Sequence, residues 1–444
     1  MDYKDTEAKR KIESYRFTTR LAAAMLLGAG FFVTNGCSDD TSDSGTSDSG
    51  TRNTVTGDSN SDTDTAFTAL ALVDARLFDG SGDPPLDAAV VIIRNKQIEA
   101  VGTADEVVVP TDARVINLDG KTVLPGLINS HVHDSAAQGV LETWLEGGVT
   151  TVRDAHVIPD DMGDLFALRD SEEPGNARVI ASGSLLTVPG GYPLLVWELP
   201  AIEITSEDQA HWKVRELVAM GADYIKIAVE SGEVMSIIAD EEPPWPTLSD
   251  EELAAVVDEA SEVNVRVAAH VTTLVDLERV VLAGVNDIMH GVVDPVPEEL
   301  LIQMVETNIS WVPTLELWKV YYDLGFEEGL PTAQENLIRF VQLGGNVALG
   351  TDFGLSPIIT FEHGTPMKEL TLMEEAGMTP TEVLVAATSG AAASCGREDI
   401  GTIAPGMMAD LIVVARDPLS DLNALQDILL IVHDGQIIRN ELNP

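Results

Sequence analysis

Two histidines one residue apart end the apolar segment at positions 124–134, which reads LPGLINSHVHD. Because side chains alternate faces along a strand, His131 and His133 are expected to point the same way from a strand end. The apolar run before them is typical of a strand buried on both faces. Two imidazoles at such a place are suited to hold a metal ion, although two seldom complete a zinc site. The alternative is a pair of surface histidines in a turn.

Four further ligand-type residues end later apolar runs. They are Lys226 in DYIKI, His270 after VRVAA, His290 after DIM and Asp352 after VALGT. One such residue would be weak evidence, since a single polar group at a strand end is more often hydrogen-bonded and structural. Six of them at successive strand ends indicate a site.

Strand and helix patterns alternate through the middle of the chain. Apolar strand candidates occur at 123–131, 149–153, 178–183, 222–229, 265–271, 287–290, 311–315 and 347–352. A capping box at Ser249 and Glu252 predicts one helix start, and a helix from Leu274 to Ala283 is predicted to end at Gly284. Eight strands alternating with helices predict an α/β fold, the TIM (β/α)8 barrel, whose active sites lie at the C-terminal strand ends.

Short β-rich segments flank this middle region on both sides. They lie at 69–77, 88–94, 97–101 and 114–118 and again at 409–415 and 428–438. The pattern predicts a small β-sandwich domain built from both ends of the folded region, residues 67–122 and 402–444. The barrel, residues 123–401, is then inserted between its two halves.

Residues 1–36 are predicted to be a lipoprotein signal peptide. A basic segment precedes the apolar run 21–33, which is too short to span a bilayer comfortably. The run leads to Gly36 and Cys37 in a sequence that resembles a bacterial lipobox, although Thr34 stands where leucine is usual. Cys37 is therefore the expected lipidation site. Ordinary signal cleavage, giving a free periplasmic or secreted protein, is the alternative.

Residues 37–66 are rich in Ser, Thr and Asp and almost without apolar side chains. Such a segment cannot bury enough surface to fold, so a disordered acidic tether is predicted. Ser38, rather than aspartate, follows the cysteine, which in Gram-negative lipoproteins usually permits transfer to the outer membrane. The expected location is the outer membrane or cell envelope.

The composition limits the classes of partner. The 444-residue chain has a formal net charge of −47 and two cysteines. Its acidic surface would repel nucleic acid and anionic headgroups, so nucleic acid is not an expected partner and membrane contact is expected only through the lipid anchor. Cys37 and Cys395 lie far apart in different contexts, so no disulfide framework is predicted.

Seven motifs together resemble the metal-dependent amidohydrolase superfamily. They are LPGLINSHVH, GVTTVRD, GADYIKI, AAHVTT, IMHG, LGTDFG and PGMMADLIVV, and the resemblance covers about residues 67 to 442. The sequence is most similar to the carbamylated-lysine binuclear group, which includes prolidase-like, Xaa-Arg dipeptidase-like and ochratoxin-amidohydrolase-like enzymes.

The resemblance implies two divalent metal ions, most often zinc, with Lys226 carbamylated by carbon dioxide and shared between them. Burial would lower the pKa of this lysine toward the neutral amine that adds carbon dioxide. A lysine whose charged end reaches solvent from the strand end is the alternative. By analogy the more buried metal is held by His131, His133 and Asp352, and the other metal by His270 and His290.

The implied mechanism is attack by a hydroxide that bridges the two metals. Asp352 would take its proton and deliver it to the leaving amine, which makes this residue catalytic as well as a ligand. Tyr192 stands in VPGGY where relatives often have histidine, and it is expected to line the pocket. His156 and His363 are further candidate substrate-binding residues, with a structural role at a helix start equally open for His363.

The expected function is hydrolysis of a C–N bond in an amide, cyclic amide or dipeptide. The same metal pair would also serve an esterase, lactonase or phosphotriesterase. A catalytically inactive surface binding lipoprotein is a further alternative, against which the intact set of six ligands argues. A mononuclear relative is disfavoured by the presence of Lys226. The expected partner is a small-molecule substrate, and a homo-oligomer is expected.

Overall fold

The computed structural model describes residues 68–442, apart from 172, 233, 238–241 and 357–359. The predicted signal peptide, the tether and Cys37 lie outside the described residues. Within the described part, none of the helices has the length and apolar character needed to cross a membrane.

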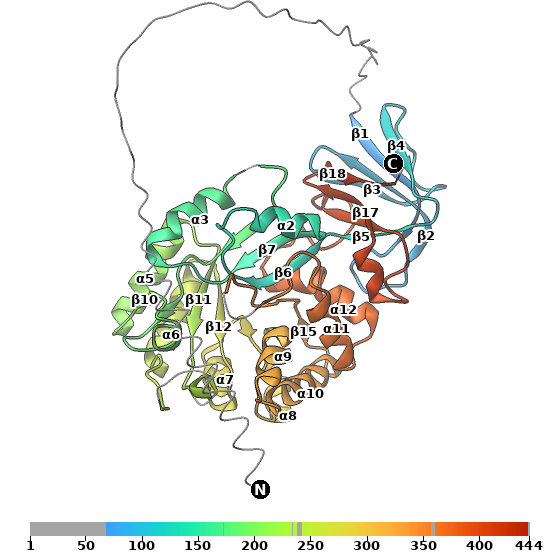
Figure 1. Cartoon of the computed structure of the whole chain (residues 1–444). Coiled ribbons are helices and arrows are strands. Elements are labelled where there is room, and N and C mark those ends of the chain that lie inside the picture. Colours follow the sequence, from blue (N-terminus) through green and yellow to red (C-terminus); the bar gives the residue numbers. More distant parts are fainter. Residues whose placement is uncertain (1–67, 172, 233, 238–241, 357–359, 443–444) are drawn as a thin grey trace, which may run out of the picture.

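Strands from the two ends of the folded region form one sheet, in which the blue and red strands of Figure 1 lie side by side. The described strands are β1 (Ala69–Leu77), β2 (Leu86–Arg94), β3 (Gln97–Thr103), β4 (Ala113–Asn117), β5 (Thr122–Pro125), β16 (Leu411–Val414), β17 (Ile428–His433) and β18 (Gln436–Asn440). Their order is β18-β17-β16-β5-β1-β2-β3, and β4 pairs in parallel with β1.

Alternate residues of these strands fill one hydrophobic core. Leu72 and Val91 from the N-terminal strands pack in the same cluster as Leu411 and Leu430 from the C-terminal strands. Because side chains alternate along a strand, one face of each strand supplies this core. The two ends of the folded region thus form a separate sheet domain with a shared core, as predicted.

The barrel consists of short parallel strands. They are β6 (Leu127–Val132), β7 (Val149–Asp154), β8 (Arg178–Ala181), β9 (Leu186–Thr187), β10 (Ile202–Glu203), β11 (Tyr224–Ala228), β12 (Arg266–His270), β13 (Asp287–Met289), β14 (Ser310–Val312) and β15 (Asn346–Val347). The ladders run β6-β7-β8 and β10-β9-β11-β12-β13-β14-β15. Backbone bonds from Asp223 N to Ala181 O (2.8 Å) and from Ser130 N to Leu349 O (2.7 Å) join the two ladders. The predicted TIM barrel is confirmed.

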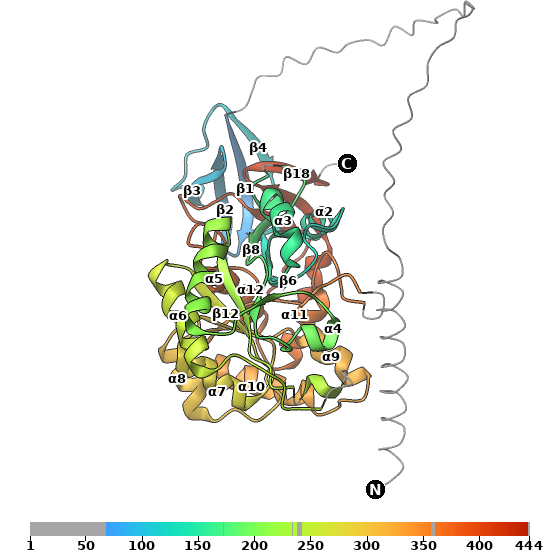
Figure 2. The ribbon, with the colours of Figure 1, turned by 90° about the vertical axis from the view of Figure 1, so that its left-hand side faces the viewer.

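Helices surround these strands, as Figures 1 and 2 show. They are α2 (Val140–Glu146), α3 (Met162–Arg169), α4 (Leu194–Trp197), α5 (Glu207–Met220), α6 (Asp250–Glu262), α7 (Leu274–Ala283), α8 (Glu298–Glu306), α9 (Leu315–Asp323), α10 (Gly329–Gln342), α11 (Met367–Glu375), α12 (Pro380–Ala386) and α13 (Ser389–Ser394). The predicted capping box at Ser249 is present, and Gly284 ends α7 in the left-handed region with φ of +85°.

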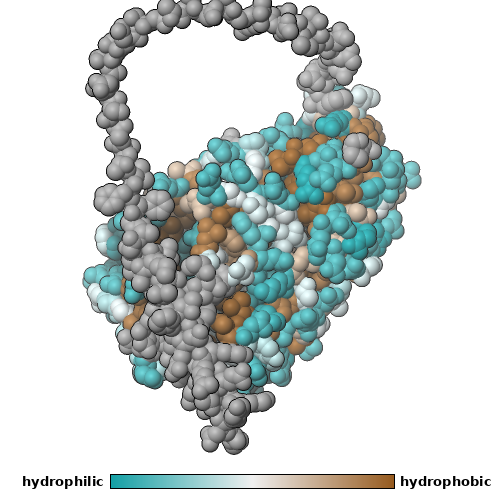
Figure 3. All heavy atoms as spheres, viewed as in Figure 1, coloured by the Kyte–Doolittle hydropathy of each residue, from teal (hydrophilic) through white to brown (hydrophobic). Residues whose placement is uncertain are grey.

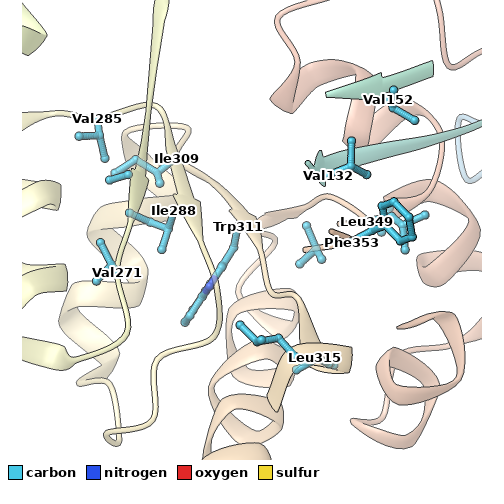
Figure 4. Packing of buried hydrophobic residues seen from close by; sticks show 14 of the residues in the cluster. Val132, Val152, Val271, Val285, Ile288, Ile309, Trp311, Leu315, Leu349 and Phe353 are labelled. Atoms are coloured by element: carbon cyan, nitrogen blue, oxygen red, sulfur yellow. The ribbon is translucent and has the colours of Figure 1, made fainter. Parts of the chain in front are cut away.

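The barrel strands and the helices enclose a large hydrophobic core. Figure 4 shows part of it, with Val132 and Val152 on β6 and β7 and Ile288 and Trp311 on β13 and β14. Close packing of this kind fixes where each strand ends, and therefore where its terminal polar residue lies. On the outer face in Figure 3, hydrophilic residues surround separate hydrophobic patches.

The prediction of a single strand at 123–131 is wrong. The segment forms two strands, because β5 pairs with β1 and β16 in the terminal sheet whereas β6 pairs with β7 in the barrel. The break falls at Pro125 and Gly126, where proline has no N–H to donate. A Cβ at Gly126 would lie 2.3 Å from the Thr150 side chain, so only glycine fits at this close approach.

Candidate metal centre

The six predicted ligands meet at the C-terminal ends of the barrel strands. They are His131 and His133 at the end of β6, Lys226 in β11, His270 at the end of β12, His290 after β13 and Asp352 after β15. The ring centroids of His131 and His290 are 4.8 Å apart, and those of His270 and His290 are 4.4 Å apart. Residues from strands distant in sequence therefore form one cluster.

The carboxylate of Asp352 lies between two of the imidazoles. Its Oδ1 atom is 3.0 Å from His131 Nε2 and 3.1 Å from His133 Nε2. Donors bound to one tetrahedral zinc ion at about 2.0 Å are separated by about 3.3 Å, so each of these two contacts suits a pair of ligands on one divalent ion. In the described part of the chain, donor atoms of His131, His290 and Asp352 all lie within 4.8 Å of one another. Burial by itself raises the pKa of Asp352, but the neighbouring His131 and His290 bring it well below its usual value. The residue is therefore a carboxylate.

Two of the predicted ligands adopt an unusual backbone conformation. His290 has φ of +80° and Asp352 has φ of +59°, in the left-handed region that residues other than glycine seldom occupy. Each such residue costs about 1–3 kcal/mol and persists only where its surroundings impose it. Here backbone bonds from His290 N to Val312 O (2.8 Å) and from Asp352 N to His131 O (2.9 Å) hold the conformation. The backbone at these strand ends thus directs the two side chains toward the other predicted ligands.

One ring nitrogen in each of two histidines already has a partner. His290 Nδ1 lies 2.9 Å from Thr314 Oγ1, and His270 Nε2 lies 3.3 Å from Glu230 Oε2. In both residues the other ring nitrogen remains available to bind a metal ion. Contacts of this kind orient the rings of metal-binding histidines.

The charge states of the imidazoles suit a metal ligand set. Burial lowers the pKa of His131, His270 and His290, which favours the neutral form that binds metals. Burial also lowers the pKa of His133, but its hydrogen bond with Asp352 raises it above the usual value overall. The partly buried carboxylate of Asp352 thus lies among imidazoles whose ring nitrogens could bind a metal ion.

Lys226 is buried with little to compensate a positive charge. Its Nζ atom lies 2.7 Å from the sulfur of Met289, and it forms no ion pair among the described residues. A thioether is a weak acceptor. Burial lowers the pKa of Lys226 to about 7, so a substantial fraction of the side chain is neutral amine at neutral pH. This is the form that reacts with carbon dioxide, and the residue therefore fits the predicted carbamate.

The family model described as "Amidohydrolase family" matches residues 122–438. This chain belongs to the amidohydrolase family. The match includes all six predicted ligands, and it confirms the resemblance drawn from the motifs.

Several relatives of this amidohydrolase are known. An ochratoxinase from Aspergillus niger is 27% identical, with 80% of this chain and 83% of the relative aligned. An imidazolonepropionase from Deinococcus radiodurans is 25% identical, with 74% and 86% aligned. The crystal structure of a putative prolidase from Bifidobacterium longum is 28% identical, with a TM-score of 0.69 over 84% of this chain and 95% of that one.

Two of the predicted substrate-binding residues lie beside the ligand cluster of the amidohydrolase. The ring of Tyr192 stacks on His270 with centroids 4.2 Å apart and planes 26° apart. His156 is buried, its carbonyl oxygen lies 3.5 Å from His133 Nδ1, and its own Nδ1 accepts a hydrogen bond from Leu185 N. Burial lowers the pKa of His156 to about 3, so this ring is neutral.

His363 is held by packing contacts. Its Nε2 donates to Val140 O at 3.0 Å, and its ring lies against Trp144 and Phe353 with centroid distances of 4.8 and 4.3 Å. The two aromatic rings pack against the imidazole, and its Nε2 hydrogen is already donated to the backbone. They favour the structural role over substrate binding.

Glu230 and Thr314 were missed from sequence, although each contacts a predicted ligand. Glu230 lies two residues after the end of β11, and its side chain is buried. A glutamate at the end of the apolar run IKIAV is the one available signal, but nothing local shows that its partner is His270. Thr314 gave no signal, since threonine is common after strands.

Proposed function

We propose that this amidohydrolase hydrolyses a C–N bond in an amide, cyclic amide or dipeptide, using two divalent metal ions, expected to be zinc. His131, His133 and Asp352 would hold one ion and His270 and His290 the other, with carbamylated Lys226 shared between them. The observation that carries the proposal is a buried lysine that has no ion pair with any described residue and lies among five further donors at the strand ends.

When bound, the two ions would supply a hydroxide nucleophile at neutral pH and polarise the scissile carbonyl. Asp352 is an anion at this point, so it can accept the proton of the nucleophile and pass it to the leaving amine. The phenol ring of Tyr192, stacked on His270, would border the substrate on one side.

The relatives support the bond type. Ochratoxinase, imidazolonepropionase and prolidase are names of enzymes that act on C–N bonds. Because they differ in substrate, they support an amide-type bond only. A screen must identify the rest of the substrate. The βα loops, which differ most within a barrel family, determine that choice.

Metal content of the purified full-length chain tests the proposal. We expect about two metal ions per wild-type chain and one or none for Lys226→Ala, because the bridging ligand is lost. Lys213→Ala is the matched control, since this lysine pairs with Glu216 on α5 and should leave metal content unchanged. A screen of N-acyl amino acids, dipeptides, cyclic amides and esters then identifies the bond.

Other outcomes would redirect the assignment. One metal per chain that is indifferent to Lys226→Ala would support a mononuclear enzyme. Absence of metal from wild type, together with inactivity in the screen, would support a binding lipoprotein. Hydrolysis confined to esters or lactones would keep the metal pair and overturn the C–N assignment.

We also propose that the protein is exported and anchored through lipidated Cys37, on the basis of the sequence before the folded region. Cys37→Ser should move the protein from the membrane fraction to the soluble fraction of the envelope. An unchanged distribution would contradict lipid anchoring.

A further inference from the structure

Glu230 has a fully buried side chain next to the proposed second metal position. Its Oε1 atom accepts a hydrogen bond from Gly232 N at 2.8 Å. Its Oε2 atom accepts from Thr272 Oγ1 at 2.6 Å and lies 3.3 Å from His270 Nε2. In the part of the chain that the structure describes, the only ion-pair partner of this carboxylate is His270.

Hydrogen bonds and close packing restrain the backbone at Ser231 and Gly232, directly after Glu230. Ser231 donates from its backbone N and from Oγ to Asp276 Oδ2, at 2.9 and 2.7 Å. Gly232 has φ of +91°, and a Cβ at this position would lie 2.4 Å from the ring of Trp245. The loop therefore requires glycine here and directs the glutamate inward, so its contact with His270 is imposed by the fold.

We propose that Glu230 is a positioning residue that fixes the tautomer and orientation of His270. A carboxylate only accepts hydrogen bonds, so His270 Nε2 must carry the proton and Nδ1 must present its lone pair. Tyr192 stacks on one face of the same ring, and the His290 ring lies 4.4 Å away, which limits rotation. The inference rests on the proposed function, because the tautomer matters only if His270 is a ligand.

Glu230 acts through His270 and is not itself the ligand. Both of its oxygens already accept hydrogen bonds from the protein, at 2.8 and 2.6 Å. Outer partners of metal-binding histidines contribute by raising ligand basicity and fixing the ring, and their loss typically weakens metal affinity by about 10–100-fold.

Glu230→Gln is the decisive variant because it preserves size and removes only the charge and one acceptor. The new amide N–H would face His270 Nε2, which must then accept a hydrogen bond, so the proton moves to Nδ1. Titration of the chelator-treated full-length protein with Co²⁺, followed by visible absorbance, should show one site unchanged and the other weakened by about 10–100-fold. A merely structural role would weaken both sites or neither.

Three further variants separate this role from general damage. Glu230→Asp keeps a carboxylate and should restore part of the lost affinity. Thr272→Val removes a neighbouring donor and leaves the contact with His270, so its effect should be under about threefold. Glu259→Gln is the matched control, since Glu259 is also buried and its Oε2 lies 2.9 Å from His211 Nδ1, but on α6. It should leave both sites unchanged.

The outcomes distinguish this inference from the proposed function. If wild type binds two ions and Glu230→Gln binds both with unchanged affinity, the positioning role is overturned and the binuclear proposal stands. If wild type binds fewer than two, the proposed function fails and the inference fails with it. Circular dichroism of each metal-free variant shows whether it folds, and if Glu230→Gln does not, Glu230→Asp decides by a selective loss at one site.

Discussion

Two groups in the described structure bring histidine and carboxylate donors within 4.8 Å of one another. One is His131, His290 and Asp352 in the barrel, and the other is Asp410, His433 and Asp434 in the terminal sheet. Judged by residue type alone, either group could be a metal site. They differ in what balances the carboxylates.

Cations of the protein neutralise the group in the sheet. Arg178 Nη1 donates to Asp410 Oδ2 at 2.6 Å, and the other guanidinium nitrogen donates to Asp434. Lys96 Nζ lies 3.4 Å from Asp434, and His433 Nδ1 lies 2.9 Å from Asp410. Since Arg178 belongs to β8 of the barrel, this network ties the barrel to the sheet.

No lysine or arginine ion pair reaches Asp352 within the described ranges, and its partners are the imidazoles of His131 and His133. A partly buried carboxylate without a neighbouring cation is costly, and coordination of a metal ion would lower that cost. Proximity of donors does not distinguish the two groups. The counter-charge that the protein supplies does distinguish them, and by this criterion the barrel group is the better candidate for a metal site.

The largest expected difference between the groups is in activity. Asp352→Asn removes the anion that accepts and delivers the proton, so kcat/KM on the amide found by screening should fall by about 10²–10⁴-fold. Asp410→Asn should change it by less than about threefold, because the sheet network is outside the site. Steady-state kinetics of both variants test this, and equal losses would contradict the distinction.

Stability, in contrast to activity, should depend on the group in the sheet. Arg178→Met leaves the Asp410 carboxylate, which is only 4% exposed, without its cation. Removing one partner of a buried ion pair typically costs about 3–5 kcal/mol, and we expect a loss of this order in the free energy of unfolding measured with urea. Metal content should not change. Loss of metal without loss of stability would make the sheet group a metal site after all.

Much of the barrel and its ligands could be predicted from the sequence because their signals are local. The run before His131, the capping box at Ser249 and the terminal Gly284 each specify a neighbouring element. In a TIM barrel the C-terminal strand ends lie on one face, so polar residues at those ends are predicted to lie together. The six candidate ligands could therefore be named without knowing which residues are in contact.

What could not be predicted depends on contacts between residues distant in sequence. Glu230 meets His270 across 40 positions, and Arg178 meets Asp410 across 232. The break between β5 and β6 was hidden because both strands are buried throughout, so no change in hydrophobic pattern marks the passage from one sheet to the other. In each case the local sequence fits more than one arrangement.

The smallest expected effect is a pH dependence of stability that belongs to the sheet group. Burial by itself raises the pKa of Asp410, but the hydrogen bond with His433 and the charge of Arg178 outweigh it and hold the pKa well below its usual value. A carboxyl whose pKa is lowered by folding stabilises the protein above its unfolded pKa of about 3.9, and this contribution is lost as the pH falls through the folded pKa.

Asp410→Asn removes the titrating group while asparagine keeps much of the hydrogen bonding, so its cost should be smaller than that of Arg178→Met. The difference in unfolding free energy between wild type and Asp410→Asn should be constant near neutral pH and should shrink as the pH is lowered below about 4. Urea unfolding across that range measures it, with Asp83→Asn, at an exposed position, as the control for loss of one acidic charge. A difference that stays constant down to the lowest pH would mean that Asp410 contributes through packing alone. Arg178 would then tie the barrel to the sheet through Asp434.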